Sequence, residues 1–262
     1  SDHGGLIKYP DYDTPKIGDA WGLNVGLMEE LGYTPNVFAR GLGLGSIKTI
    51  GIMCSDSSDP YLAHAIYYLE RDLRTNGYDS ILCCTGNSLE TKRQYFELLR
   101  SKKVDAIIIA GSKFIEMKIK DNAYIIDAAK ELPIILVNGY LEGENIYCTL
   151  CDDRTATHYA TSQLIASGCR KILYLFSSYS YSGTNKMKGY RDALCGRGLS
   201  VQDEYIHQCE KDVLAARDLL LRLHKEGLPF DAVLTSDDAL AVGAVKYAHM
   251  TGRSIPDDLS II

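Results

Sequence analysis

Short apolar runs alternate with longer amphipathic stretches from residue 50 to the end of the chain, and this alternation limits the fold more than any other feature. The apolar runs have the length of buried strands, and the amphipathic stretches are long enough to form helices. Such alternation is typical of βα units around a parallel sheet. For the first half it predicts strands at 50–54, 79–84, 104–109 and 133–138 and helices at 60–76, 88–101 and 120–131.

A short crossing strand is predicted at 147–151, after which the alternation begins again. The second half is predicted to contain helices at 154–167, 184–197, 212–226 and 238–251 and strands at 171–176, 204–208 and 231–235. The predicted fold class is therefore α/β, with two Rossmann-like lobes that each contain a parallel sheet. Ligands of such sheets bind at the carboxyl ends of the strands, so we expect a ligand cleft between the lobes. We place the lobes at 50–146 and 147–262.

The residues before the first strand form a helix end followed by a connector. Gly32 can take a left-handed cap conformation and Pro35 prevents simple continuation, so a helix is expected to end within 31–36. Residues 37–49 are a short connector, and its glycines at 41, 43 and 45 would keep it disordered by itself.

Composition limits the partners of the chain. With 262 residues, of which 46% are apolar, it is long enough for two lobes with a sizeable core. A formal net charge of −6 argues against a surface covered with phosphate-binding cations, so any nucleic-acid contact must come from a local patch or a separate headpiece. No apolar run approaches the ~20 residues of a membrane span, and residues 1–13 do not resemble a signal peptide. We therefore expect a cytoplasmic protein without membrane contact.

The eight cysteines do not form a recognisable metal site. Cys54, Cys83 and Cys84 lie in apolar runs and are expected to be buried free thiols. Cys148 and Cys151 have the spacing of a redox motif or half a zinc site, but a second ligand pair is missing. We predict structural thiols, no metal and no cofactor.

The order of helix end, connector and first strand resembles the lactose-repressor/galactose-repressor family of bacterial transcription regulators. The resemblance covers residues 16–262 and rests on Tyr33, Pro35-Asn36, Ala39-Arg40, Leu42 and Ile50-Gly51. It implies a periplasmic-binding-protein-like core of type I. Residues 1–36 would be a remnant or atypical headpiece without a recognisable helix-turn-helix, and 37–49 would be the hinge. Roughly the last quarter of a typical member does not follow Ile262, so we expect a truncated chain.

The resemblance assigns DNA contact to the hinge. The candidate hinge or DNA-binding residues are Tyr33, Asn36, Arg40 and Leu42. Leu42 stands where the family inserts an apolar side chain into the minor groove and kinks the duplex. A flexible linker is the alternative reading of the glycine-rich connector. Gly43 and Ser46 are uncharged where the family often has basic residues, which argues against strong DNA binding.

Polar and aromatic side chains follow several successive strands, where a parallel sheet would present them to one cleft. The candidate effector-binding residues are Ser55, Asp56, Tyr61, Ser112, Asn138, Asp152, Tyr181, Ser182, Lys186 and Asp238. Carboxylates and hydroxyls beside aromatic rings suit a polyol ligand. By resemblance, Lys186 takes the position of an effector-binding arginine, and Asp238 that of an acid that accepts hydrogen bonds from ligand hydroxyls. Asp152 and Asp238 could instead be helix N-caps.

The resulting prediction is a sugar- or small-metabolite-responsive DNA-binding transcriptional regulator, with repression favoured. The alternative is a sugar-binding protein of transport or chemoreception, against which the connector motif counts. An enzyme is not predicted, because no Walker lysine, GxSxG or HExxH motif appears. The expected partners are a small-molecule effector, operator DNA in the intact protein and a second copy of the chain. The resemblance implies that this homodimer forms through the helices at 60–76 and 88–101.

Overall fold

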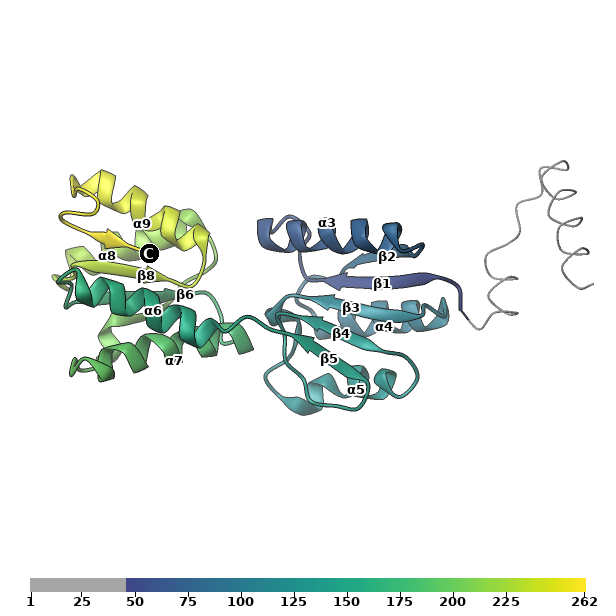
Figure 1. Ribbon diagram of the computed structural model, residues 1–262. Helices are drawn as coiled ribbons and strands as arrows, with labels where there is room; N and C mark the ends of the chain where they lie inside the picture. Colours follow the sequence, from purple (N-terminus) through teal and green to yellow (C-terminus); the bar gives the residue numbers. More distant parts are fainter. Residues whose placement is uncertain (1–45) are drawn as a thin grey trace, which may run out of the picture. The chain divides into compact units, whose positions relative to one another are not determined.

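Two parallel sheets organise the part of the chain that the structure describes, residues 46–262 of a computed structural model (Figure 1). Residues 48–262 form one compact unit. The two sheets confirm the predicted α/β fold. The predicted headpiece, most of the hinge, and Tyr33, Asn36, Arg40 and Leu42 lie outside the described residues.

The first sheet has the strand order β2-β1-β3-β4-β5, with every pair parallel. Its strands are β1 (Thr49–Cys54), β2 (Asp79–Cys84), β3 (Ala106–Ala110), β4 (Ile134–Val137) and β5 (Ile146–Thr149). One face packs against α3 (Pro60–Thr75), and the other against α4 (Leu89–Ser101) and α5 (Ala123–Ala129). All side chains of β1 are buried, as expected for a central strand covered on both faces.

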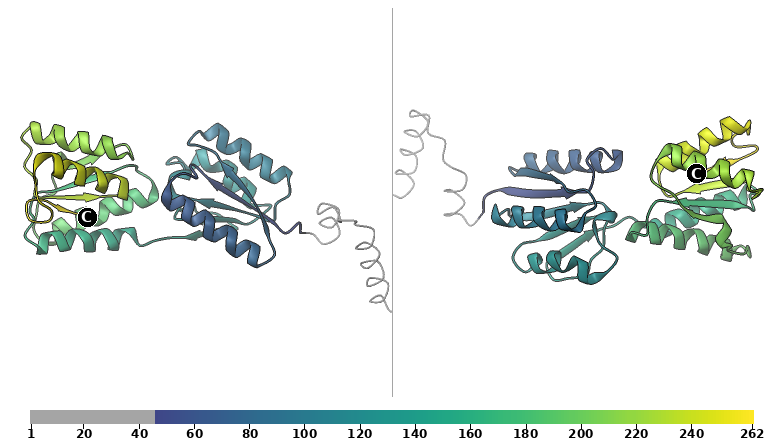
Figure 2. Two further views of the ribbon diagram at one scale, coloured as in Figure 1. Left: turned by 90° about the horizontal axis from the view of Figure 1, so that it is seen from above. Right: turned by 180° about the vertical axis from the view of Figure 1, so that it is seen from behind.

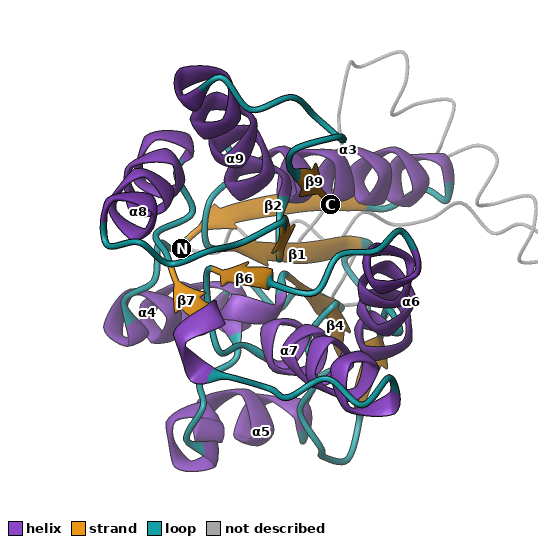
Figure 3. Cartoon of the chain, turned by 90° about the vertical axis from the view of Figure 1, so that its left-hand side faces the viewer, coloured by secondary structure: helices purple, strands orange, loops and turns teal. Residues whose placement is uncertain are grey.

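The second sheet has the order β7-β6-β8-β9, again with parallel pairs. Its strands are β6 (Ile172–Phe176), β7 (Ile206–Gln208), β8 (Ala232–Thr235) and β9 (Ser260–Ile261). One face packs against α6 (Asp153–Ala166) and α7 (Tyr181–Gly196), and the other against α8 (Val213–Lys225) and α9 (Asp238–Thr251). Figures 2 and 3 show these helices on either side of the sheet.

Glycine allows the close contact between α6 and α7. A Cβ atom on Gly189 in α7 would lie only 2.2 Å from the carbonyl oxygen of Arg154 in α6. A larger residue would therefore force the two helices apart.

The main departure from the predicted elements concerns the chain between the two sheets. The strand predicted at 147–151 is β5, which pairs with β4 at the edge of the first sheet. Asn145 turns the chain into this strand at a φ of 59°, and its side chain donates to the carbonyl oxygen of Ala129 at 2.9 Å. The boundary predicted between 146 and 147 therefore falls inside a strand of the first lobe, and the sheet changes after Thr149.

Three other elements differ from the prediction in type or by more than two residues at one end. The helix predicted at 120–131 is a 3₁₀ turn, η2 (Ile119–Asn122), followed by the shorter α5. The strand predicted at 204–208 is likewise a 3₁₀ turn, η3 (Asp203–Tyr205), followed by β7. The helix predicted from residue 184 begins at Tyr181, because the hydroxyl of Ser180 accepts from the backbone N–H of Gly183 at 3.2 Å and caps the helix there.

One expectation for the cysteines is wrong. Cys54 and Cys83 are buried, but Cys84 is exposed. The reason is the strand order, since β2 is an edge strand and its outer residues are only partly covered. Within residues 46–262, no helix combines the length and apolar character that a membrane crossing requires.

Candidate functional site

A pocket of about 580 Å³ lies at the carboxyl ends of strands from both sheets. This volume is within the range of small-molecule sites. It is lined by seven of the ten predicted residues: Ser55, Tyr61, Ser112, Asn138, Ser182, Lys186 and Asp238. Most of the predicted effector-binding residues therefore lie together in one pocket at the strand ends.

Asp56, Asp152 and Tyr181 do not line the pocket. Asp56 bends back on its own loop and accepts hydrogen bonds from the backbone N–H and hydroxyl of Ser58, which lower the pKa of its carboxyl. Asp152 caps α6 by accepting from the N–H of Thr155 at 3.0 Å, as the alternative reading foresaw. The ring of Tyr181 stacks on that of Tyr140, with centroids 5.2 Å apart.

Two other acids provide buried carboxylate oxygens in the second-lobe half of the pocket. Asp153 is 9% exposed, and Oδ2 of its side chain has no hydrogen-bond partner among the described residues. Oδ1 of Asp237 is likewise unpartnered there, whereas its Oδ2 accepts from the hydroxyl of Ser236 at 3.0 Å. Buried oxygens without donors are costly, so a ligand that donates hydrogen bonds would be favoured here.

The sequence predicted the neighbours of these two acids, Asp152 and Asp238, as effector-binding residues. Asp152 takes the cap position of α6, and Asp153 begins the helix and is buried instead. At α9 the acid with the buried oxygen is the first of the pair and the exposed acid is the second. Asp237 takes the cap position without a side-chain capping bond, and Asp238 is exposed at the pocket lining. Asp238 is therefore open to solvent, and the buried carboxylate oxygen of this pair belongs to Asp237. The repeated acid pairs were the only sequence signal for Asp153 and Asp237.

Tyr174 of β6 lies close to both acids. Its side chain is 0% exposed, and its hydroxyl has no partner among the described residues. Burial raises the pKa of Tyr174, and the charges of Asp153 and Asp237 add to the shift. The Tyr174 hydroxyl therefore stays protonated at neutral pH.

The first lobe adds an aromatic ring and an amide. Tyr61 is half exposed in the pocket lining, so its ring can cover an apolar ligand face. Burial raises the pKa of the Tyr61 hydroxyl, and negative charge on Cys151 and Asp153 adds to the shift. Asn138, which follows β4 at a φ of 57°, has a buried Oδ1 without a partner among the described residues. This oxygen is a third acceptor for ligand hydroxyls.

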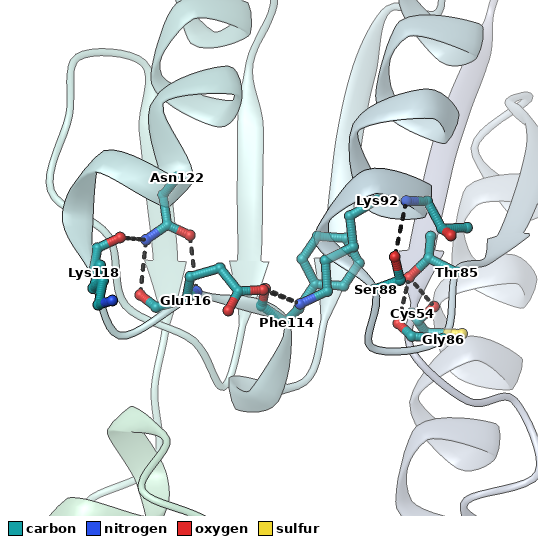
Figure 4. Close-up of polar contacts among 10 residues, drawn as sticks. Cys54, Thr85, Gly86, Ser88, Lys92, Phe114, Glu116, Lys118 and Asn122 are labelled. Atoms are coloured by element: carbon teal, nitrogen blue, oxygen red, sulfur yellow. Dashed lines mark hydrogen bonds and ion pairs between the residues drawn. The ribbon is translucent and has the colours of Figure 1, made fainter.

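The loop that carries Ser112 and Lys113 is anchored from α4. Lys92 is 1% exposed, and its ammonium group donates to the carbonyl oxygen of Phe114 at 2.9 Å and to Oε1 of Glu116 at 2.6 Å (Figure 4). These bonds fix the 3₁₀ turn η1 (Ser112–Phe114) beside the pocket.

A buried amide holds the far end of the same loop. Asn122 is 1% exposed, and its Oδ1 accepts from the backbone N–H of Glu116 at 2.8 Å. Its Nδ2 donates to the carbonyl oxygen of Glu116 at 2.8 Å. The sequence did not predict this loop support, because Lys92 lies 22 and 24 positions from its two partners and Asn122 lies in a segment predicted to be a helix.

Two of the three lysines at the pocket have partners, and the third, Lys113, is exposed. Lys186 donates to the carbonyl oxygen of Ser236 at 2.8 Å and lies 4.0 Å from Oδ1 of Asp153. Lys211 pairs with Asp59. Burial lowers the pKa of Lys113, and the like charge of Lys211 adds to this. These three lysines line the pocket beside four aspartates, Asp59, Asp153, Asp237 and Asp238. The lining therefore has no excess of positive charge.

Two polar contacts join the lobes at the pocket. The hydroxyl of Ser112 donates to that of Ser180 at 3.0 Å, and Asp59 at the start of α3 pairs with Lys211 of the second lobe. Burial alone would raise the pKa of Asp59, but bonds from Lys211 and from backbone N–H groups outweigh it and lower the pKa.

No group of three metal-ligating side chains occurs among residues 46–262. The thiol of Cys148 donates to the carbonyl oxygen of Leu141 at 3.7 Å, and Cys151 lines the pocket. The pocket offers hydroxyls, carboxylates and an amide, which suit reversible binding of a polar ligand.

Residues 47–262 match the family described as periplasmic binding proteins and sugar binding domain of the LacI family. The chain belongs to this family. An HTH-type transcriptional regulator of Lachnoclostridium phytofermentans is 55% identical over 236 residues, which are 90% of this chain and 71% of that regulator. The regulator GalR of Escherichia coli is 28% identical over 253 residues, covering 95% of this chain and 72% of GalR.

Comparison with solved structures supports the same family. A sugar-binding transcriptional regulator of the LacI family from Escherichia coli, complexed with phosphate, has a TM-score of 0.71 at 25% identity and covers 83% of this chain and 78% of that one. The predicted resemblance is thus confirmed, and the LacI-family chain is a transcriptional regulator that includes the effector-binding core. These relatives are named as regulators, which favours this reading over a transport or chemoreception protein.

Proposed function

We propose that the pocket of this LacI-family chain binds a neutral sugar or a related polyhydroxylated metabolite as the effector that regulates transcription. The observation that carries the proposal is the set of buried acceptor oxygens on Asn138, Asp153 and Asp237, which have no donors among the described residues. Vicinal hydroxyls of a sugar would donate to them, and a hydrogen bond to a charged acceptor contributes about 1.5–3 kcal/mol. Tyr61 would cover an apolar face of the sugar ring.

The charges at the pocket support a neutral ligand over a phosphorylated one. The phosphate of an anionic ligand would require a free cation or several free backbone N–H groups. Lys186 and Lys211 already have acidic or carbonyl partners. Asp153 and Asp237 would repel an anion.

Effector binding would act by stabilising one arrangement of the lobes. The bonds from Ser112 to Ser180 and between Asp59 and Lys211 are available only when the two lobes lie close together. A ligand that bridges Asn138 and the second-lobe acids would favour the same arrangement. In the intact protein we propose that this change is passed through the hinge at 37–49 to an operator-bound headpiece.

A thermal-shift screen of monosaccharides, disaccharides, their phosphates and purines tests the ligand class. A ligand at 100 times its dissociation constant adds about 2.7 kcal/mol to the free energy of unfolding. We expect stabilisation by one or more neutral sugars and none by their phosphates. Stabilisation by phosphorylated sugars or purines alone would contradict the proposal.

We propose that the first lobe also mediates self-association. The helix α3 exposes Tyr67 and Tyr68, which are 60% and 52% exposed, and the edge strand β2 exposes Leu82 at 46%. Apolar side chains on one lobe would be covered by the same surface of a second copy. Sedimentation should show a dimer that Tyr67→Lys weakens, and a monomer at high micromolar concentration would contradict this proposal.

A further inference from the structure

Two cysteines face one another on neighbouring strands beside the pocket. Cys54 of β1 and Cys84 of β2 are partners in the parallel register, and their Sγ atoms lie 3.8 Å apart. Neighbouring strands are about 4.8 Å apart, which is within the Cα separation of about 4.4–6.8 Å that disulfides span. The two side chains can therefore be joined without a change in strand pairing.

We propose that Cys54 and Cys84 form a reversible disulfide when the protein meets a hydroperoxide. All eight cysteines lie among the described residues, and this is the only pair of them whose thiols are in hydrogen-bond contact there. Cys83 is next to Cys84 in sequence, but it packs into the core on the other face of the sheet. The strand order, and not proximity in sequence, selects the partner.

The two thiols have different surroundings, and this difference assigns their roles. Cys84 is exposed, so the oxidant reaches it first. Cys54 is 0% exposed, and burial, with the neighbouring Cys84, raises its pKa to about 12. Cys54 is thus protected from direct oxidation and acts as the resolving thiol. Because it must lose a proton before it attacks, closure of the disulfide is the slower step.

The reaction balances with the hydroperoxide as the sole oxidant. The thiolate of Cys84 attacks the peroxide, forming an S–O bond and breaking the O–O bond, with release of an alcohol or water. Cys54 then loses its proton and attacks the sulfur of Cys84, forming the S–S bond, and the sulfenic oxygen leaves as water. Two electrons pass from the thiols to the peroxide, and a dithiol reductant reverses the change.

The disulfide would alter the pocket because Cys54 directly precedes Ser55 in its lining. The carbonyl oxygen of Cys54 accepts from the backbone N–H of Thr85 at 2.9 Å and from the Thr85 hydroxyl at 3.3 Å, and Figure 4 shows the bond from the hydroxyl. The N–H of Gly86 donates to the carbonyl oxygen of Ser55 at 3.0 Å. Since the sulfur atoms must approach from 3.8 Å to about 2.05 Å, this backbone would shift with them. We expect oxidation to change effector affinity, a consequence that rests on the proposed function.

The test is peptide mapping of the full chain after hydrogen peroxide treatment, with free thiols blocked by iodoacetamide. The expected product has lost two hydrogens, contains a Cys54–Cys84 linked peptide and returns to the starting mass with dithiothreitol. Cys54→Ser should instead leave Cys84 as a sulfenic acid that dimedone traps. Cys195→Ser, which removes an exposed cysteine of α7, should leave the linkage unchanged.

Two results would overturn the proposal: no Cys54–Cys84 peptide in the wild-type chain, or as much dimedone-trapped Cys84 in wild type as in Cys54→Ser. The linkage is measured without a ligand. A disulfide that forms while no sugar binds would therefore count against the proposed function alone.

Discussion

The ammonium group of Lys92 lies 2.6 Å from Oε1 of Glu116, and this ion pair connects α4 to the loop that carries two pocket residues. Lys92 is buried, whereas the side chain of Glu116 is 30% exposed. The pair fixes the loop containing Ser112 and Lys113, which lie in the short 3₁₀ turn η1 and not in a strand or a long helix.

Lys92→Met should loosen this loop while it keeps most of the side-chain volume. The carbonyl oxygen of Phe114 would lose its donor, at a cost of about 1–3 kcal/mol in the free energy of unfolding. Effector affinity should fall as well, because Ser112 and Lys113 lose their fixed position. Urea unfolding and ligand titration measure the two effects. Lys118→Met is the control, since that exposed side chain should change stability by no more than about 0.5 kcal/mol.

Asp153→Asn should weaken effector binding by tenfold or more. The variant keeps the shape of the side chain, but its uncharged amide accepts weaker hydrogen bonds from ligand hydroxyls. Asp152→Asn is the matched control, because asparagine caps a helix about as well as aspartate and residue 152 does not line the pocket. Isothermal titration with the sugar found in the screen gives both affinities, and equal losses for the two variants would refute the assignment.

Asp237→Asn should reduce effector affinity more than Asp238→Asn does. The buried Oδ1 of Asp237 is shielded from water, whereas Asp238 is exposed and its bonds to a ligand compete with solvent. The ratio of the two dissociation constants checks this order. A larger loss for Asp238→Asn would restore the role expected for it from the sequence alone.

The contribution of Asp59 to stability should depend on pH. Its pKa is lowered in the folded protein, so its stabilising effect is present above the ordinary aspartate pKa of 3.8 and is lost as pH falls through the folded value. The wild type should therefore be more stable than Asp59→Asn at neutral pH, and the difference should shrink below about pH 4.

Unfolding curves between pH 3 and 7 measure this difference. Asp257→Asn provides the control, because the Asp257 side chain is exposed and forms no hydrogen bond or ion pair within residues 46–262. A wild-type advantage that persists unchanged at pH 3 would contradict the role of the Asp59–Lys211 pair.

The sequence by itself determined the βα units and the ends of most strands. Apolar runs such as 50–54 and 232–234 carry this information locally, because a strand covered on both faces must be apolar along its length. The same local pattern placed Ser55, Ser112 and Asn138 near one cleft, since strand ends in a parallel sheet lie on one edge.

Only the tertiary structure decided which acid of each adjacent pair is buried. Successive residues at a helix start point about 100° apart, so a one-residue difference in where the helix begins exchanges the roles of Asp152 and Asp153. The strand order likewise decided that Cys54 meets Cys84, and the approach of the two lobes brought Lys211 to Asp59. These contacts join residues 30 and 152 positions apart, and no local periodicity in the sequence records them.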